Sequence, residues 1–294
     1  MKKKIHFIIN SRSEKAIADL KKELSSNEFW EKTYTIFFWK SLYKGHALEL
    51  TQKAIQDGTS SIVACGGDGT INEIARFLVD TEIPLGIIPL GSGNGVARHF
   101  KIPLNVKGSL KVIRDQHTVV VDAGLANRHF FLSNMGVSFD AVFINAYQNI
   151  PTRGLLSYFK ALFSALKDYK PQHFTLHYTD IQREVNPFLL MISNANQFGY
   201  DFSISPNSLL TDGKFELILF KNKSILTLFK LFLASRFGLK LSEDLLEIIP
   251  ISELVIESKH KESLIQLDGE INWTITKKIH IQMHPSGLNV FIPN

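Results

Sequence analysis

The chain has 294 residues, a net charge of +5, 45% hydrophobic residues and 21% charged residues. This composition is typical of a globular protein, and no low-complexity stretch or fixed-period repeat interrupts it. The length exceeds what one hydrophobic core usually spans, so we expect two domains. The one cysteine, Cys65, has no partner for an intramolecular disulfide, which fits a reducing cytoplasm.

No segment of the sequence is typical of a leader peptide or a membrane span. The apolar run at 5–9 is interrupted by His6 and is too short for a signal peptide. The most apolar later segment, 225–233, contains Lys230 and is not expected to cross a bilayer. Basic residues form no dense block with interleaved aromatics, so we expect no nucleic-acid partner. The mild positive charge favours an ordinary solvated surface, and weak attraction to anionic lipid is the alternative. We therefore expect a soluble cytoplasmic protein, and peripheral attachment to a membrane is left open.

The first 120 residues alternate between strand-like and helix-like patterns. Apolar residues at spacings of three and four, such as Ile17, Leu20 and Leu24, indicate helices. The apolar runs between the helices are continuous, which predicts parallel strands covered on both faces. In chain order we predict a strand at 4–10, a helix at 17–24, a strand at 33–39, a helix at 45–58, a strand at 61–65, a helix at 71–78 and a strand at 85–90.

After about residue 118 the pattern changes to many short strands separated by turns, which predicts an antiparallel β-sandwich. These strands are expected at 118–122, 129–133, 174–178, 188–193, 215–220, 254–257, 264–267 and 279–283. Two helices interrupt them, at 154–169, with Leu155, Phe159, Leu162 and Leu166 facing inward, and at 224–237. The predicted fold is thus an α/β domain at 1–120 followed by a β-sandwich domain at 121–294, whose last few residues can pack on the first domain.

Two glycine-rich loops each follow a predicted parallel strand and precede a helix, one at 66–70 and the other at 91–95. Ligands bind at this end of the strands in open α/β sheets. Glycines let the backbone approach a phosphate closely, and a helix N-terminus supplies N–H donors. Asp68 would be repelled by a polyphosphate unless a cation lay between them, so we assign it to Mg²⁺.

Simpler interpretations of these loops remain open. Asp68-Gly69 can be a tight turn, and Thr70 or Ser92 can be a helix cap. The loop at 91–95 also matches half of a dinucleotide fingerprint, but that fingerprint requires the loop after the first strand of its unit. Cys65 is expected to be a buried core residue, not a nucleophile.

Five motifs occur in order along nearly the whole chain: Gly66-Gly-Asp-Gly-Thr-Ile-Asn-Glu73, Leu85-Gly-Ile-Ile-Pro-Leu-Gly-Ser-Gly-Asn94, Asp122-Ala-Gly124, Thr211-Asp-Gly-Lys-Phe215 and Asp268-Gly-Glu270. Together they resemble the diacylglycerol kinase catalytic-domain family, which includes bacterial lipid kinases and sphingosine kinases. The resemblance implies a nucleotide-binding α/β domain similar to those of NAD kinases and phosphofructokinases, followed by a β-sandwich. It also implies ATP as co-substrate and Mg²⁺ as cofactor.

The resemblance further implies roles for individual residues. It implies that Glu270 is the catalytic base and that Asp68 and Asp122 are also catalytic. It implies that Asp122 belongs to a polar network near the γ-phosphate. A structural Mg²⁺ would be held by the Asp212 carboxylate and by the backbone carbonyls of Leu209 and Lys214. The implied nucleotide contacts run from Asn10 to Glu14 and include Ser41, Gly66, Gly67, Asp68, Gly69, Thr70, Ile71, Asn72 and Ser92.

Two departures from the family pattern matter. The first loop places Glu14 where relatives usually have glycine, which puts that phosphate contact in doubt unless Arg12 or Lys15 compensates. The second loop ends in Asn94-Gly95 where diacylglycerol kinases usually have aspartate, and this form resembles sphingosine kinases.

We expect an ATP-dependent lipid kinase that phosphorylates a hydroxyl of a diacylglycerol-like or sphingoid lipid at a membrane surface; a homodimer is left open. One alternative is an NAD kinase-like enzyme with a soluble acceptor, and another is a catalytically idle nucleotide-binding regulator. NAD kinases share the first glycine loop but usually carry their Asn-Glu pair in a later motif, so Asn72-Glu73 favours the lipid acceptor.

Overall fold

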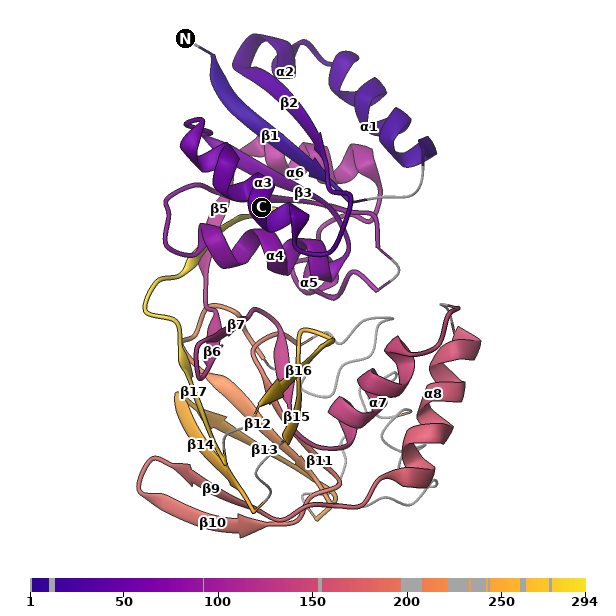
Figure 1. Cartoon of the computed structure of the whole chain (residues 1–294). Helices are drawn as coiled ribbons and strands as arrows, with labels where there is room; N and C mark the ends of the chain where they lie inside the picture. Colours follow the sequence, from indigo (N-terminus) through magenta and orange to yellow (C-terminus); the bar gives the residue numbers. More distant parts are fainter. Residues whose placement is uncertain are drawn as a thin grey trace. The chain divides into compact units, whose positions relative to one another are not determined.

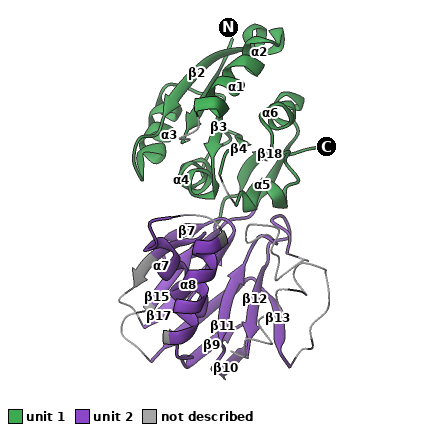
Figure 2. Cartoon of the chain, turned by 90° about the vertical axis from the view of Figure 1, so that its right-hand side faces the viewer, with its two compact units in different colours: residues 1–121, 285–294 green, residues 122–284 purple. Residues whose placement is uncertain are grey.

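The computed structural model describes residues 2–10, 14–91, 93–152, 155–196, 208–221, 233, 242, 244–259, 263–274 and 277–294, apart from the side chains of 155, 168, 263 and 272–274. The helix expected at 224–237 and the expected nucleotide contacts at Ser92 and 11–13 lie outside the described residues. The chain forms two compact units, 1–121 with 285–294, and 122–284 (Figure 2).

Unit 1 is a six-stranded sheet with strand order β2-β1-β3-β4-β18-β5 (Figure 1). Its elements are β1 (Lys3–Ile9), α1 (Glu14–Ser25), α2 (Glu28–Thr33), β2 (Tyr34–Lys40), α3 (His46–Gln56), β3 (Ser61–Gly66), α4 (Asp68–Leu78), β4 (Leu85–Pro89), α5 (Gly95–His99), α6 (Val106–Asp115), β5 (Thr118–Val121) and β18 (Leu288–Phe291). The strands β1 to β4 are parallel, which confirms the predicted parallel sheet. The C-terminal strand β18 lies between β4 and β5, parallel to the first and antiparallel to the second.

Helices bury both faces of this sheet. On one face, α1, α2 and α6 contribute Leu20, Trp30 and Ile113 to a cluster with the strand residues Phe7 and Cys65. On the other face, α3 contacts β1 and α4 contacts β3. Cys65 is fully buried, and burial raises the pKa of its thiol strongly, so it is the predicted inert core residue.

Unit 2 is a sandwich of two six-stranded antiparallel sheets, as the short-strand pattern predicts. One sheet has the order β10-β9-β14-β17-β6-β7 and the other β13-β12-β11-β8-β15-β16. The elements are β6 (Gly124–Ala126), β7 (His129–Phe131), β8 (Asn134–Gly136), α7 (Phe139–Gln148), α8 (Leu155–Asp168), β9 (Phe174–Tyr178), β10 (Ile181–Val185), β11 (Leu189–Ser193), β12 (Phe215–Phe220), β13 (Leu246–Ile251), β14 (Glu253–Ser258), β15 (Ser263–Leu267), β16 (Glu270–Thr274) and β17 (Lys278–Met283).

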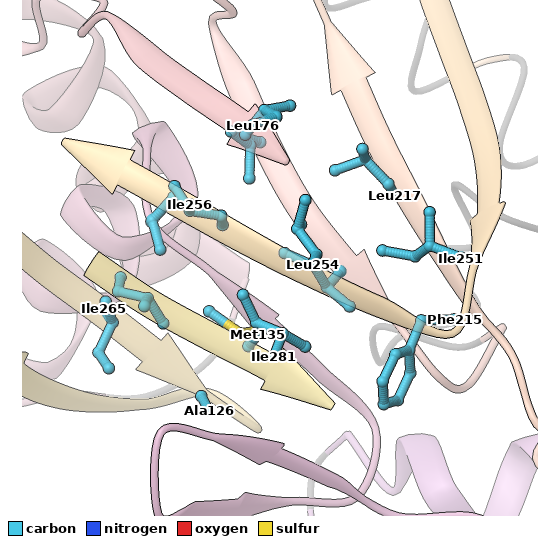
Figure 3. Packing of buried hydrophobic residues seen from close by; sticks show 14 of the residues in the cluster. Ala126, Met135, Leu176, Phe215, Leu217, Ile251, Leu254, Ile256, Ile265 and Ile281 are labelled. Atoms are coloured by element: carbon cyan, nitrogen blue, oxygen red, sulfur yellow. The ribbon is translucent and has the colours of Figure 1, made fainter. Parts of the chain in front are cut away.

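The two sheets enclose one apolar layer. Figure 3 shows side chains such as Leu254 and Ile281 from one sheet and Phe215 and Leu217 from the other within that layer. The side chains that alternate with these, such as Ile218, face α7 and α8, which cover the opposite face of the second sheet. Both faces of the sheet are therefore buried at β12, which explains why every residue of this strand is buried.

Among the described side chains, α8 differs from the prediction at Phe159; the side chain of Leu155, also expected to face inward, lies outside the described residues. Phe159, expected to face inward, is 45% exposed, while Ala161 and Ala165 are buried against the sheet. Small side chains bring the helix close to its neighbours, while Leu156, Phe159 and Phe163 lie exposed on its outer side. Leu162 and Leu166 are partly buried, as predicted. Within the described residues, no helix combines the length and the apolar character that crossing a membrane requires.

Candidate active site

The two glycine loops meet at the carboxyl edge of the unit 1 sheet. Strands β3 and β4 pair in parallel register with Gly66 opposite Pro89, and the Leu90 amide donates to the Gly66 carbonyl at 2.9 Å. A Cβ atom on Gly91 would lie 2.5 Å from the Gly67 Cα, closer than any side chain permits. The loops are therefore in direct backbone contact, and only glycine fits there.

Polar groups from two further strands converge on the same edge. The Asn10 side chain, directly after β1, donates from Nδ2 to Thr70 Oγ1 at 3.1 Å. The Asn10 amide donates to the Cys65 carbonyl, and the Ser41 amide, directly after β2, donates to the Ile9 carbonyl, both at 2.9 Å. The structure thus brings together Asn10, Ser41 and Thr70, three of the predicted nucleotide contacts. Such an edge, lined by amide and hydroxyl groups, is suited to an anionic ligand.

The start of α4, residues 68–72, contains five of the predicted contacts. The amides of Thr70 and Ile71 donate to the Gly67 carbonyl at 3.0 and 3.1 Å. Ile71 is fully buried, so its backbone alone can contact a ligand. Gly69 and Asn72 are partly buried in the same turn. Glu14 is an exposed residue at the start of α1.

Asp68 connects the two loops in a way that the sequence did not predict. Its two carboxylate oxygens accept hydrogen bonds from the amides of Gly95, at 3.0 Å, and Val96, at 3.1 Å. These are the first amides of α5, so this carboxylate already occupies the donors that were expected to face phosphate. Each oxygen keeps lone-pair capacity for a cation. Asn94 completes the loop through a reciprocal pair of side-chain hydrogen bonds with the Gly91 amide and carbonyl.

Glu73 is a site residue whose structural role sequence reasoning missed. Its Oε1 accepts a hydrogen bond from the Gly45 amide at 2.9 Å and so fixes the start of α3 four residues after Ser41. The sequence contained a signal for this role: Glu73 is an acidic residue four positions after Gly69, so the two residues lie on the same face of α4.

In unit 2, Asp122 is tied to the loop that carries the predicted metal ligands. Its amide donates to the Leu210 carbonyl at 2.6 Å, and its Oδ2 accepts from the Gly213 amide at 2.8 Å. Within the same loop, the Lys214 amide donates to Asp212 Oδ1 at 3.1 Å. The structure therefore places Asp122 beside Asp212 and Lys214, and Leu209 precedes them with its side chain exposed.

A buried carboxylate next to this loop fits the requirements of a cation site. Glu216, on β12, is 8% exposed, and its Oε2 atom has no hydrogen-bond partner within the described part of the chain. Burial and the negative charge of nearby Asp212 raise the pKa of Glu216, while a hydrogen bond with Ser208 opposes this. An orphaned carboxylate oxygen near a second carboxylate would be satisfied by a bound Mg²⁺. No group of three acidic, histidine or cysteine side chains that could hold a metal occurs among the described residues, so backbone carbonyls are needed to complete such a site.

Glu270 follows a two-residue turn between β15 and β16. Asp268 and Gly269 have φ angles of 49° and 79°, and Leu267 pairs with Glu270, as in a type I′ hairpin. The Asp268 carboxylate accepts hydrogen bonds from the backbone amides of residues 132–134 at 2.6–2.9 Å. Asp268 therefore holds the turn in place, and Glu270 follows the turn as the first residue of β16.

A buried polar network lies beneath this turn. Gln266 donates from Nε2 to Asn134 Oδ1 at 2.9 Å and to Asp140 Oδ2 at 3.1 Å. Burial raises the pKa of Asp140 to about 6, against the opposing hydrogen bonds from Gln266 and Ser138. Sequence reasoning missed these residues, because residues 134, 140 and 266 meet only in the folded sandwich.

The parallel sheet of unit 1 and the antiparallel sandwich of unit 2 define an α/β domain combined with a β-sandwich domain. The family model for the diacylglycerol kinase catalytic domain matches residues 4–126, and that for the YegS C-terminal NAD kinase beta sandwich-like domain matches residues 134–292. The chain therefore belongs to the diacylglycerol kinase catalytic-domain family, among the bacterial lipid kinases that carry the YegS-type sandwich.

Relatives agree with this assignment, and solved structures share the fold. A protein of Chromohalobacter salexigens named "Probable lipid kinase YegS-like" is 30% identical over 232 residues, 77% of this chain and 74% of that protein. A diacylglycerol kinase of Mycobacterium tuberculosis is 26% identical over 254 residues, 83% of this chain and 73% of that protein. In fold, the chain is similar to a diacylglycerol kinase of Bacillus anthracis, with a TM-score of 0.77 and 18% identity over 99% of this chain and 97% of that one. An NAD kinase of Archaeoglobus fulgidus shares the fold at a TM-score of 0.55 and 13% identity over 98% of this chain and 93% of that one.

Proposed function

We propose that this protein transfers the γ-phosphate of ATP to a hydroxyl of a diacylglycerol-like or sphingoid lipid. The observation that carries the proposal is the backbone contact of the two glycine loops, at Gly67 and Gly91, in a chain of the diacylglycerol kinase catalytic-domain family. Two loops that touch at glycines, beside the side chains of Asn10 and Thr70, form a surface on which a triphosphate can lie. No covalent intermediate with the protein is needed, since phosphoryl transfer depends mainly on positioning and charge neutralisation.

Each group in the reaction then has a distinct role. The lipid hydroxyl oxygen forms a bond to the γ-phosphorus as the bond to the β-phosphate oxygen breaks, and Glu270 takes the hydroxyl proton. Asp68 holds the two loops together and is the acidic group beside the triphosphate. Mg²⁺ would neutralise phosphate charge near Asp68, and a second, structural Mg²⁺ would be held by Asp212 with the carbonyls of Leu209 and Lys214. Asp122 supports that loop through the Gly213 amide.

The outer face of α8 supports a lipid acceptor presented at a membrane. Leu156, Phe159 and Phe163 are 77%, 45% and 62% exposed and recur at helical spacing. Lys160 and Lys167 are exposed on the same helix. Large apolar side chains with nearby lysines favour contact with the surface of an anionic bilayer.

A transfer assay with radiolabelled ATP and Mg²⁺ tests the proposal. Diacylglycerol, sphingosine and NAD are offered separately, and the product is partitioned between organic and aqueous phases. We expect label in the organic phase. Label only in NADP would establish the soluble-acceptor alternative, and nucleotide binding without any transfer would establish the idle regulator.

Two variants assign the roles within this assay. We expect Glu270→Ala to abolish transfer while it still binds ATP, and Asp68→Ala to abolish transfer. Glu253→Ala is the matched control for Glu270→Ala, since Glu253 is an exposed glutamate at the start of β14 in the same unit. Full turnover of either site variant would contradict the assigned roles.

A further inference from the structure

The turn before Glu270 needs support from outside its own hairpin. Both of its central residues, Asp268 and Gly269, have positive φ angles, and for Asp268 this conformation is unfavourable because it carries a Cβ atom. Glu270 is the first residue of β16, so any change in the turn moves its backbone directly. The position of this carboxylate therefore depends on whatever holds Gly269.

Gly269 is held at both of its backbone polar groups. Its amide donates to Gln266 Oε1 at 2.9 Å, and its carbonyl accepts from Gln148 Nε2 at 3.0 Å. Gln266 belongs to β15, and Gln148 is the last residue of α7. Two glutamines from different elements thus form hydrogen bonds to the backbone of the residue that precedes Glu270.

The orientation of the Gln266 amide determines whether the first of these bonds forms. Its Nε2 donates to Asp140 Oδ2 and Asn134 Oδ1, which leaves Oε1 facing the Gly269 amide. If the amide were turned over, Nε2 would face the Gly269 N–H group, and two donors would oppose each other. An ionised Asp140 offers acceptors only, so it selects the orientation that supports the turn.

Asp140 is itself fixed in place. Its Oδ1 accepts from the Ser138 amide at 3.2 Å and from Ser138 Oγ at 3.1 Å. Ser138 Oγ also accepts from the Leu190 amide of β11 at 2.6 Å. A Cβ atom on Gly136 would lie 1.5 Å from Asp140 Oδ2, so glycine at 136 makes room for the carboxylate. These contacts link α7, β8, β11 and β15 into one rigid support.

We propose that Asp140 and Gln266 are positioning residues for phosphoryl transfer. Asp140 sets the orientation of the Gln266 amide, Gln266 holds Gly269, and Gly269 places the carboxylate of Glu270. This inference rests on the proposed function, in which Glu270 is the base. Asp140 acts through the network and does not itself touch the lipid or the nucleotide.

An exchange of the two functional groups tests the network. In Asp140→Asn, the new amide nitrogen faces Gln266 Nε2, so Gln266 turns over and releases Gly269. In Gln266→Glu, two carboxylates face each other. The double variant, which combines Asp140→Asn with Gln266→Glu, restores complementarity with donor and acceptor reversed. The amide at position 140 now donates to the carboxylate at position 266, whose other oxygen accepts from the Gly269 amide, and Asn134 can turn its own amide to donate as well.

The expected kinetic pattern is specific to a positioning role. We expect each single variant to lose kcat by about a hundredfold, as a displacement of about 1 Å at a reacting group does. The KM for ATP should stay within about twofold, since the glycine loops are unchanged, and the double variant should regain most of the lost kcat. Amide hydrogen exchange at Gly269, measured by NMR, should be fast in both single variants and slow in the wild type and the double variant.

A variant at the surface tests the same inference if the buried variants fail to fold. Gln148→Ala removes the bond to the Gly269 carbonyl at an exposed position. Asn149→Ala is its control, since the Asn149 side chain donates to the Asn145 carbonyl within its own helical turn. We expect a lower kcat and faster Gly269 exchange for Gln148→Ala alone.

The possible failures are distinguishable. Wild-type kcat and slow Gly269 exchange in Asp140→Asn or Gln148→Ala, beside an inactive Glu270→Gln, would overturn the inference and leave the proposed function standing. A fully active Glu270→Gln would overturn the proposed function instead, and the exchange data would then still decide whether the network holds Gly269.

Discussion

Replacing Gly91 with alanine should separate the two glycine loops. The new Cβ atom would lie 2.5 Å from the Gly67 Cα and 2.8 Å from Asn94 Oδ1. Carbon atoms in contact normally lie about 3.5–4.0 Å apart, so the loops must part by about 1 Å. Because the opposing atom at Gly67 is backbone, no side-chain rotation can relieve the overlap. We expect overpacking to destabilise the fold by about 1–3 kcal/mol.

The functional loss should exceed what the lost stability explains. A displacement of about 1 Å at the phosphate-binding edge should lower kcat/KM for ATP by about a hundredfold. Calorimetric titration with Mg·ATP and the radiolabel assay, both well below the melting temperature, measure this loss on folded protein.

A matched control lies nearby in the same sheet. In Gly86→Ala, on β4, the new Cβ atom would meet the flexible end of Ile113 at 2.9 Å, away from the loops. We expect this variant to lose stability and keep its ATP affinity. If Gly91→Ala bound Mg·ATP like the wild type, or if Gly86→Ala weakened ATP equally, the backbone contact would not be the basis of the site.

Two further predictions concern the buried His6 and the exposed Asp212. His6 is fully buried, with Nδ1 2.8 Å from Thr59 Oγ1, and burial lowers its pKa. Because the unfolded chain then binds the proton more readily, stability should fall as the pH drops below about 6.5; urea unfolding at pH 7.5 and 5.5 should show a smaller loss in His6→Gln, and equal losses would refute this. Mg²⁺ at ten times its Kd should stabilise the wild type by about 1.4 kcal/mol. In Asp212→Asn we expect no such rise in Tm, whereas Asp180→Asn, at an exposed turn, should respond like the wild type.

The local sequence pattern was sufficient to predict much of the secondary structure of unit 1. The continuous apolar runs at 61–65 and 85–90 predicted β3 and β4 within one residue at each end, since a strand buried on both faces has no polar alternation. The motif order also led to the correct family. These features depend on residues close together in the chain, so they can be read from local sequence.

Other features of the site depend on contacts between distant residues. Phe159 has the spacing of an inward residue, yet small residues on α8 pack more closely and turn it outward. The sequence did not predict that Asp68 also caps α5, a contact that forms because the fold brings β3 and β4 side by side.

The sequence by itself determined that the first strands are parallel, where the two glycine loops lie, that a sandwich follows, and which family the chain belongs to. Only the tertiary structure decided that β18 inserts between β4 and β5, and that Gln266 bonds Asp140 across 126 residues. The physical reason is that periodicity and turn chemistry act over a few residues. Pairing across more than a hundred residues is instead selected by the packing and hydrogen bonding of the whole core.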